Sequence, residues 1–75
     1  MEQLLQIIAK NLVNHPEDVS VKVTEKESTI VLELSVAQED MGKVIGKQGR
    51  VAKAIRTVVK AASLNEDKKV VVEIV

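Results

Sequence analysis

The chain has 75 residues, of which 45% are hydrophobic, and it contains no cysteine and no aromatic residue. A chain of this length makes one small domain, and we expect residues 1–75 to be that domain. The absence of cysteine excludes disulfides and thiolate metal sites, and a single histidine cannot build a zinc site. No apolar run approaches the roughly 20 residues that cross a bilayer. The first residues lack a basic n-region, so we expect no signal peptide and a cytoplasmic protein.

The net charge of +0 conceals an uneven distribution of charge along the sequence. Residues 1–40 carry eight acidic and three basic side chains. Residues 41–65 carry no acidic side chain and six basic ones, which are Lys43, Lys47, Arg50, Lys53, Arg56 and Lys60. Such a segment attracts anions within a Debye length of about 8–10 Å, whatever the total charge. A solvated helix face is the alternative interpretation.

The first part of the sequence predicts a helix and a hairpin. Apolar residues recur at helical spacing from Met1 to about Asn14, with Ile7 on the polar side, where we expect it to be exposed. Pro16 ends this helix, because the residue before a proline avoids the α region. Alternating apolar residues predict strands over 19–23 and 30–36, and the short polar turn between them favours an antiparallel hairpin.

A short helix is expected over about 38–45. Glu39 and Asp40 suit its first turn, where the helix dipole favours negative charge. The residues spaced to face a core are Met41, Val44 and Ile45.

A longer helix is expected over about 50–62, followed by a strand over 70–75 that is rich in β-branched residues. The apolar residues of this helix cover about half of its circumference. They are Val51, Ala54, Ile55, Val58, Val59, Ala61 and Ala62. The resulting order, α-β-β-α-α-β, predicts a two-layer α+β fold in which three helices cover one face of a three-stranded sheet.

All three glycines of the chain, Gly42, Gly46 and Gly49, lie within or between the last two predicted helices. Glycine costs backbone entropy when it is held in one conformation, so this concentration requires a reason. A Gly46-Lys47-Gln48-Gly49 loop can turn sharply and approach a ligand closely. The first N–H groups of the following helix are expected to be unpaired and, with the nearby cations, to favour an anion. We therefore interpret the loop as a clamp for the phosphates of single-stranded nucleic acid.

Other glycine motifs fit this segment poorly. A Walker A loop has four residues between its glycines and a hydroxyl residue after the lysine, whereas three residues separate Gly42 from Gly46 and Gln48 follows Lys47. A dinucleotide-binding fingerprint follows a strand, and Lys43 excludes a membrane-dimerisation GxxxG motif. No nucleophile–base pair and no group of metal ligands accompanies the glycines. We therefore expect no enzymatic activity, no cofactor and no metal.

The segment from Val44 to Ile55, VIGKQGRVAKAI, resembles the signature of the KH (K-homology) domain, whose GxxG loop clamps about four nucleotides. The element order corresponds to the type II, prokaryotic arrangement. Together with Asp40-Met41-Gly42 and residues 54–62, the segment makes the whole chain resemble the KhpA family of small bacterial RNA-binding proteins. The resemblance implies single-stranded RNA as the ligand, with single-stranded DNA as the alternative. It also implies a homodimer, or a complex with a larger KH-containing partner of the Jag/EloR kind.

The resemblance further implies where nucleic acid would lie, in a groove between the two loop-flanking helices and the last strand. The apolar wall beneath the bases would include Gly42, Ile45 and Ala52. The opposing strand edge would be formed by Val70, Val71 and Val72, with Lys68 and Lys69 at the mouth of the groove. The expected RNA-binding residues are Gly42, Lys43, Ile45, Gly46, Lys47, Gln48, Gly49, Arg50 and Lys53.

Composition also limits how such a site can work. Without Phe, Tyr or Trp no base can stack on an aromatic ring, so we expect salt-sensitive binding with loose sequence preference and dissociation constants on the order of micromolar or weaker. The expected role is that of a regulatory RNA chaperone or post-transcriptional regulator. The alternative function is an interaction module whose main role is assembly, because the apolar arc of the helix over 50–62 is broader than one sheet contact needs.

Overall fold

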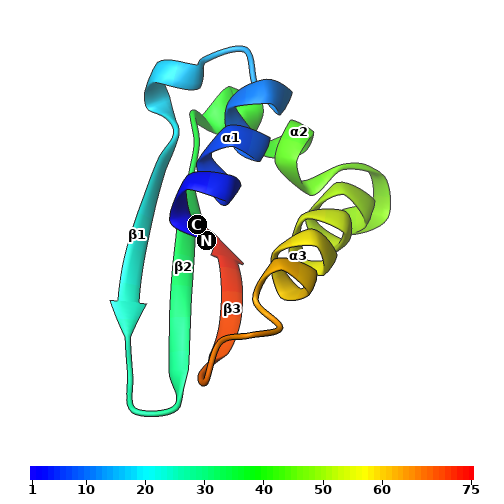
Figure 1. Cartoon of the computed structure of the whole chain (residues 1–75). Coiled ribbons are helices and arrows are strands. Elements are labelled where there is room, and N and C mark those ends of the chain that lie inside the picture. Colours follow the sequence, from blue (N-terminus) through cyan, green and yellow to red (C-terminus); the bar gives the residue numbers. More distant parts are fainter.

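The computed structural model describes residues 1–75, which follow the expected order of elements (Figure 1). The helices are α1 (Glu2–Leu12), α2 (Met41–Ile45) and α3 (Arg50–Ala62), and the strands are β1 (Ser20–Glu25), β2 (Thr29–Ser35) and β3 (Lys69–Ile74). Three short 3₁₀ turns accompany them, η1 (Pro16–Asp18), η2 (Gln38–Asp40) and η3 (Lys47–Gly49). The helix expected over 38–45 is therefore a 3₁₀ turn followed by a very short α-helix. Each helix is too short or too polar to cross a membrane.

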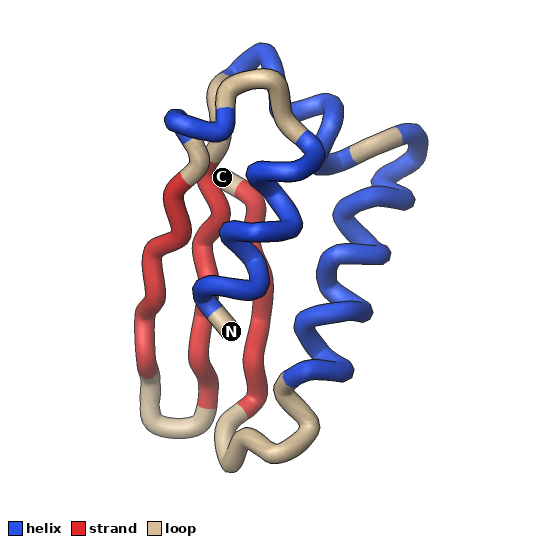
Figure 2. The backbone as a smooth tube through the Cα atoms, turned by 45° about the horizontal axis from the view of Figure 1, so that its top comes forward, coloured by secondary structure: helices blue, strands red, loops and turns tan.

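The strands form one mixed sheet in the order β1-β2-β3. β1 and β2 pair antiparallel through the expected hairpin, and β3 lies parallel to β2 because α2 and α3 carry the chain back between them. Val31 aligns with Val71 on one face of the sheet. Val21 aligns with Leu34, and Leu32 with Val72, so these apolar side chains share the other face. The helices lie over that face (Figure 2). The expected two-layer α+β fold is confirmed.

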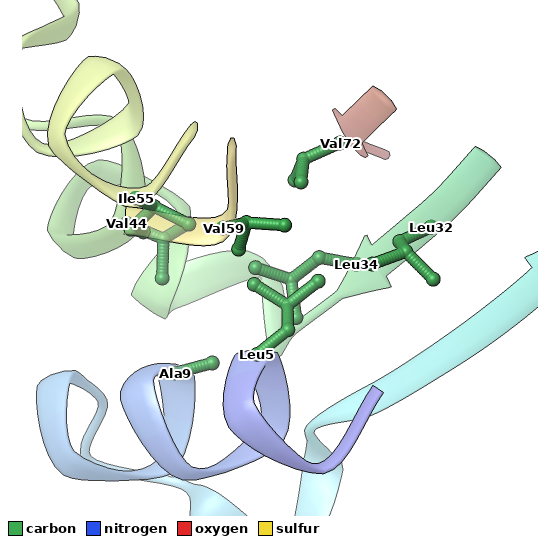
Figure 3. Close-up of a cluster of buried hydrophobic side chains, with 8 residues drawn as sticks. All are labelled: Leu5, Ala9, Leu32, Leu34, Val44, Ile55, Val59 and Val72. Atoms are coloured by element: carbon green, nitrogen blue, oxygen red, sulfur yellow. The ribbon is translucent and has the colours of Figure 1, made fainter. Parts of the chain in front are cut away.

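The core lies between the helices and the sheet, where side chains from all three helices meet those of β2 and β3 (Figure 3). Its eight members are Leu5, Ala9, Leu32, Leu34, Val44, Ile55, Val59 and Val72. Full burial of one leucine, isoleucine or valine side chain stabilises a fold by about 1.5–3 kcal/mol. Val44 fixes the short α2 and Ile55 fixes α3 to this one core. The loop between these two helices is therefore held at both ends.

The apolar arc expected on α3 is only partly buried. Ile55 and Val59 enter the core as expected, and Ala52 is also buried. Val58, however, is 47% exposed, and Ala54 is exposed as well. The burial agrees with the expectation that the apolar arc is broader than the contact of α3 with the sheet needs. Ile7 on α1 is 59% exposed, as expected.

The segment over 38–45 corrects one expectation and adds one buried residue. Ile45 is 38% exposed, so only Val44 and the half-buried Met41 of the three predicted residues turn inward. Asp40 lies in the first turn, as expected, but it is fully buried. Its two carboxylate oxygens accept hydrogen bonds from the backbone N–H groups of Asn14, at 3.2 Å, and His15, at 2.9 Å. Asp40 thus ties the end of α1 to the start of α2, a long-range contact that local sequence pattern does not reveal.

Replacing Asp40 tests this tie. In the variant Asp40→Asn, an amide NH₂ faces one of the two backbone donors, so that donor loses its acceptor. We expect the free energy of unfolding to fall by about 1–3 kcal/mol. The measurement is urea denaturation followed by far-ultraviolet circular dichroism. The control is Glu39→Gln, an exposed neighbour that should change stability by no more than about 0.5 kcal/mol. Equal effects of the two substitutions would contradict a structural role for the buried carboxylate.

Candidate nucleic-acid interface

The loop between α2 and α3 is a sharp turn built from backbone conformations that favour glycine. Gly46, which ends α2, has φ 76° and ψ 177°, and Gly49, which precedes α3, has φ 75° and ψ 15°. Gln48 between them has φ 57° and is the one residue other than glycine with a positive φ. A non-glycine residue in the left-handed region costs about 1–2 kcal/mol. The two glycines flank this unfavourable residue, as the GxxG pattern predicts.

Gly46 also allows the turn to lie against the first turn of α3. A Cβ on Gly46 would collide with the side chain of Val51 and would lie 2.9 Å from the backbone nitrogen of that residue. Gly42 is different, because it has no positive φ and a Cβ there would meet nothing within 4 Å. The protein's own packing thus explains Gly46 but gives no reason for Gly42.

The backbone amides of the turn are less available than the sequence suggests. Gly49 donates its N–H to the carbonyl of Gly46 at 3.2 Å, and Arg50 donates to the carbonyl of Lys47. The expectation that all the first N–H groups of this helix are unpaired is therefore wrong for Arg50, whose amide closes a 3₁₀ turn. No side chain caps the first turn of α3.

The side chains of the turn point to solvent. Lys47 and Gln48 are exposed, and Arg50 is exposed with its Nη2 atom 3.5 Å from Oε1 of Gln48. Lys43 on α2 and Lys53 on α3 are exposed too. The turn is therefore a projecting, positively charged surface rather than a part of the core.

None of the cations of residues 41–65 has a carboxylate partner. The two ion pairs of the protein are Lys68–Glu25 at 3.4 Å and, when His15 is protonated, His15–Glu17 at 3.6 Å. On α3, Lys53, Arg56 and Lys60 are spaced i, i+3 and i+7, so they follow one another along one side of the helix. The positive surface consequently continues from the turn down the length of α3.

A groove runs between α3 and the free edge of β3, and we call it the strand groove. Its cavity measures about 230 Å³ and is lined by Arg56, Lys60, Lys69, Val70, Val71 and Val72. A second hollow of about 280 Å³ continues it towards the loop after α3 and is lined by Lys60, Ser63, Leu64, Lys68, Lys69 and Val70. No acidic side chain lines either hollow. Sequence reasoning placed the last strand and its lysines here but did not assign Arg56 and Lys60 to the site.

The structure distributes the expected wall residues differently. Gly42 and Ile45 are exposed on α2 and remain available to a ligand. Ala52 is 4% exposed, so its expected place beneath the bases is wrong. Val72 is 5% exposed and turns its side chain into the core, leaving only its backbone at the strand groove.

A second groove, here called the helix groove, was not expected as such. It lies between α1 and α3, measures about 330 Å³, and is lined entirely by apolar side chains: Leu4, Ile8, Leu12, Val51, Ala54, Ile55 and Val58. The sequence feature that could have indicated this groove is the broad apolar arc of α3. The part of that arc that the sheet does not cover lines the groove.

Comparison with known proteins agrees with this architecture. The family model described as KhpA/KhpB, KH domain, matches residues 2–74. RNA-binding protein KhpA of Clostridium perfringens is 67% identical over 75 residues, the full length of both chains. RNA-binding protein KhpA of Listeria monocytogenes is 53% identical over 75 residues, covering all of this chain and 99% of the relative. These relatives are named for binding RNA and belong to a non-enzymatic family, in agreement with the expectation that the chain is not an enzyme.

Among solved structures, the chain is similar to Aquifex aeolicus Era bound to GDP and AlF₄⁻. The TM-score is 0.68 with 21% identity, over 97% of this chain and 28% of the Era chain. At that identity the likeness concerns the fold alone. The match over nearly the whole chain and the high identity to full-length relatives show that this chain belongs to the KhpA/KhpB family of KH-domain proteins.

Proposed function

We propose that residues 1–75 act as one KH domain that binds single-stranded RNA in the cytoplasm, with the turn at residues 46–49 holding the sugar-phosphate backbone. The observation that carries the proposal is the exposed, sharply bent turn with cations on both sides and no acidic residue from 41 to 65. The curated relatives are named RNA-binding protein KhpA, which supports RNA as the ligand.

Each part of the site has a distinct role in this proposal. Gly46, Lys47, Gln48 and Gly49 hold the phosphates, and Lys43, Arg50 and Lys53 supply positive charge around them. Gly42 and Ile45 form the surface of α2 that the RNA approaches. The RNA then continues between α3 and β3, where the strand groove contains only cationic and aliphatic residues.

The composition determines what kind of RNA binder this is. With no aromatic ring to stack on, affinity comes from phosphate contacts, hydrogen bonds and aliphatic contact with bases, so it should fall steeply with salt. Such binding is weak, reversible and loosely selective, which suits a regulatory RNA chaperone or post-transcriptional regulator. The phosphate contacts alone also permit single-stranded DNA, which serves as the comparison ligand.

The clamp is tested by the double variant Lys47→Asp, Gln48→Asp, which keeps both flanking glycines and places two anions where a phosphate should lie. We expect binding to a labelled single-stranded RNA to fall by at least tenfold, because repulsion replaces attraction at the point of contact. The measurement is fluorescence anisotropy at several salt concentrations, with the fold checked by circular dichroism.

The matched control is Ser20→Asp, Lys22→Asp on β1, which changes the net charge by the same amount on exposed residues at the edge of the sheet opposite to β3 (Figure 1). A clamp at residues 46–49 predicts that this control binds nearly as well as the unchanged protein. Equal losses in the two variants would mean that only the overall charge matters, and equal affinity of the clamp variant and the unchanged protein would exclude the turn as the contact.

Gly42→Ala separates the needs of the fold from those of the ligand. Gly42 lies inside α2 with open space at its Cβ position, so alanine should stabilise the fold by about 0.5–1 kcal/mol. If RNA passes over α2 at close range, the same methyl group should weaken binding several-fold. A more stable protein with unchanged affinity would remove Gly42 from the proposed site.

Assembly is a second candidate function, and the helix groove favours it. Seven apolar side chains line it and no charged one does, so two copies could pair around a twofold axis without placing like charges against each other. We propose a homodimer through this groove. A larger KH-containing partner of the Jag/EloR kind is the alternative occupant. Self-association and RNA binding use different surfaces and are compatible.

Val58→Asp tests the dimer, because it places a charge on the exposed rim of the helix groove without disturbing the core. Size-exclusion chromatography with light scattering should give about twice the 8.2 kDa chain mass for the unchanged protein and a single chain mass for the variant. The control is Thr57→Asp, an exposed neighbour outside the groove. A monomeric unchanged protein at high concentration would contradict the homodimer.

A further inference from the structure

β3 is an edge strand whose second side is free of any other strand. Lys69 donates its backbone N–H to Ser28 at 3.1 Å, and Val75 donates to Leu34 at 2.9 Å, so the odd-numbered residues direct their peptide groups to β2. Since peptide groups alternate along a strand, those of Val70 and Val72 point away from β2 and into the strand groove. The carbonyl of Val72 is therefore an acceptor on the free edge of the sheet.

Arg56 on α3 reaches across the strand groove to this acceptor. Its Nε atom donates a hydrogen bond to the carbonyl oxygen of Val72 at 3.4 Å. That distance is long for an N–H···O bond, so the contact orients the guanidinium rather than anchoring it firmly. No carboxylate neutralises it, because both ion pairs of the protein lie elsewhere and the other polar side chains of the groove, Lys60 and Lys69, are cations.

The remaining donors of Arg56 define what it can bind. A guanidinium carries five N–H groups in one plane, and with Nε engaged the two terminal nitrogens still present a pair of parallel donors. Such a pair matches two acceptors that are adjacent on one planar edge. Cytosine offers O2 and N3, and guanine offers O6 and N7. Uracil has a donor between its two carbonyl oxygens, and adenine has an amino donor beside its ring acceptors.

We propose that Arg56 is a specificity-determining residue that recognises the O2 and N3 acceptors of a cytosine base in the strand groove. The inference rests on the proposed RNA binding and adds base selection to it. The aliphatic side chains of Val70 and Val71 flank the planar base, while Lys60 and Lys69 are point charges better suited to the adjoining phosphates. The bond from Nε to the carbonyl of Val72 orients the guanidinium at the strand edge before RNA arrives, so less rotamer entropy is lost on binding.

The test compares four proteins with three labelled octamers, of cytidine, uridine and adenosine, by fluorescence anisotropy at fixed salt. The proteins are the unchanged chain, Arg56→Lys, Arg56→Met, and Lys53→Met as the control that removes one charge from the same side of α3. We expect the unchanged chain to bind the cytidine octamer at least fivefold more tightly than the other two. Arg56→Lys keeps the positive charge but removes the pair of parallel guanidinium donors. This variant should therefore lose the preference for cytidine, while its affinity for the uridine octamer changes less than twofold. Lys53→Met should weaken all three octamers by one common factor.

Several outcomes would overturn the inference. Absence of any cytidine preference in the unchanged chain would do so directly. If Arg56→Met weakens all three octamers equally, as Lys53→Met does, and lowers the salt dependence by about one counterion, then Arg56 is a phosphate contact only. If the Arg56 variants unfold at lower urea concentrations but keep every affinity, Arg56 serves only to tie α3 to β3. If the variant Lys47→Asp, Gln48→Asp loses binding while the unchanged chain shows no base preference, the proposed clamp at residues 46–49 still stands. That outcome would exclude only base selection by Arg56.

Discussion

The turn at residues 46–49 depends on one close packing contact, that between the Cα of Gly46 and the side chain of Val51. Because no Cβ fits there, the chain can leave α2, reverse within four residues and begin α3 beside the point it left. Val44 and Ile55 on either side of the turn enter the same core. The turn is thus projected into solvent by two supporting helices. In the proposed complex this support would reduce the entropy lost when the turn binds a flexible nucleic-acid strand.

Local charge, and not the charge of the whole protein, makes this surface suitable for a polyanion. The chain is neutral overall, yet the acidic residues are confined to the segments before and after residues 41–65. The fold keeps that separation, since neither ion pair involves a cation of this segment. Unpaired lysines and arginines on a rigid helix attract phosphates at short range, while overall neutrality limits attraction to unrelated polyanions at longer range.

Periodicity in the sequence predicts the elements and their order, because each helix and strand is stabilised by residues close together in the chain. The bounds of α3 agree with those expected, and the GxxG turn lies where its glycines indicate. What periodicity cannot predict are contacts that depend on tertiary packing. Asp40 binds backbone groups more than 20 residues away, Ala52 is buried, and half of the α3 arc is left for a second groove. The Arg56 contact with Val72 is of the same kind.

The two grooves on either side of α3 explain why a single helix can carry such a mixed composition. Its apolar residues contribute to the core and the helix groove, and two of its cations, Arg56 and Lys60, line the strand groove. If α3 packed only on the sheet, a narrower stripe of apolar residues would be enough. If α3 bound only phosphates, it would not need apolar residues outside the core. Because the two surfaces are on opposite sides of one rigid helix, pairing of two chains would leave both cationic grooves open. In the proposed dimer, two linked grooves would raise the effective concentration of each for a long RNA and so compensate for the weak affinity expected of a site without aromatic residues.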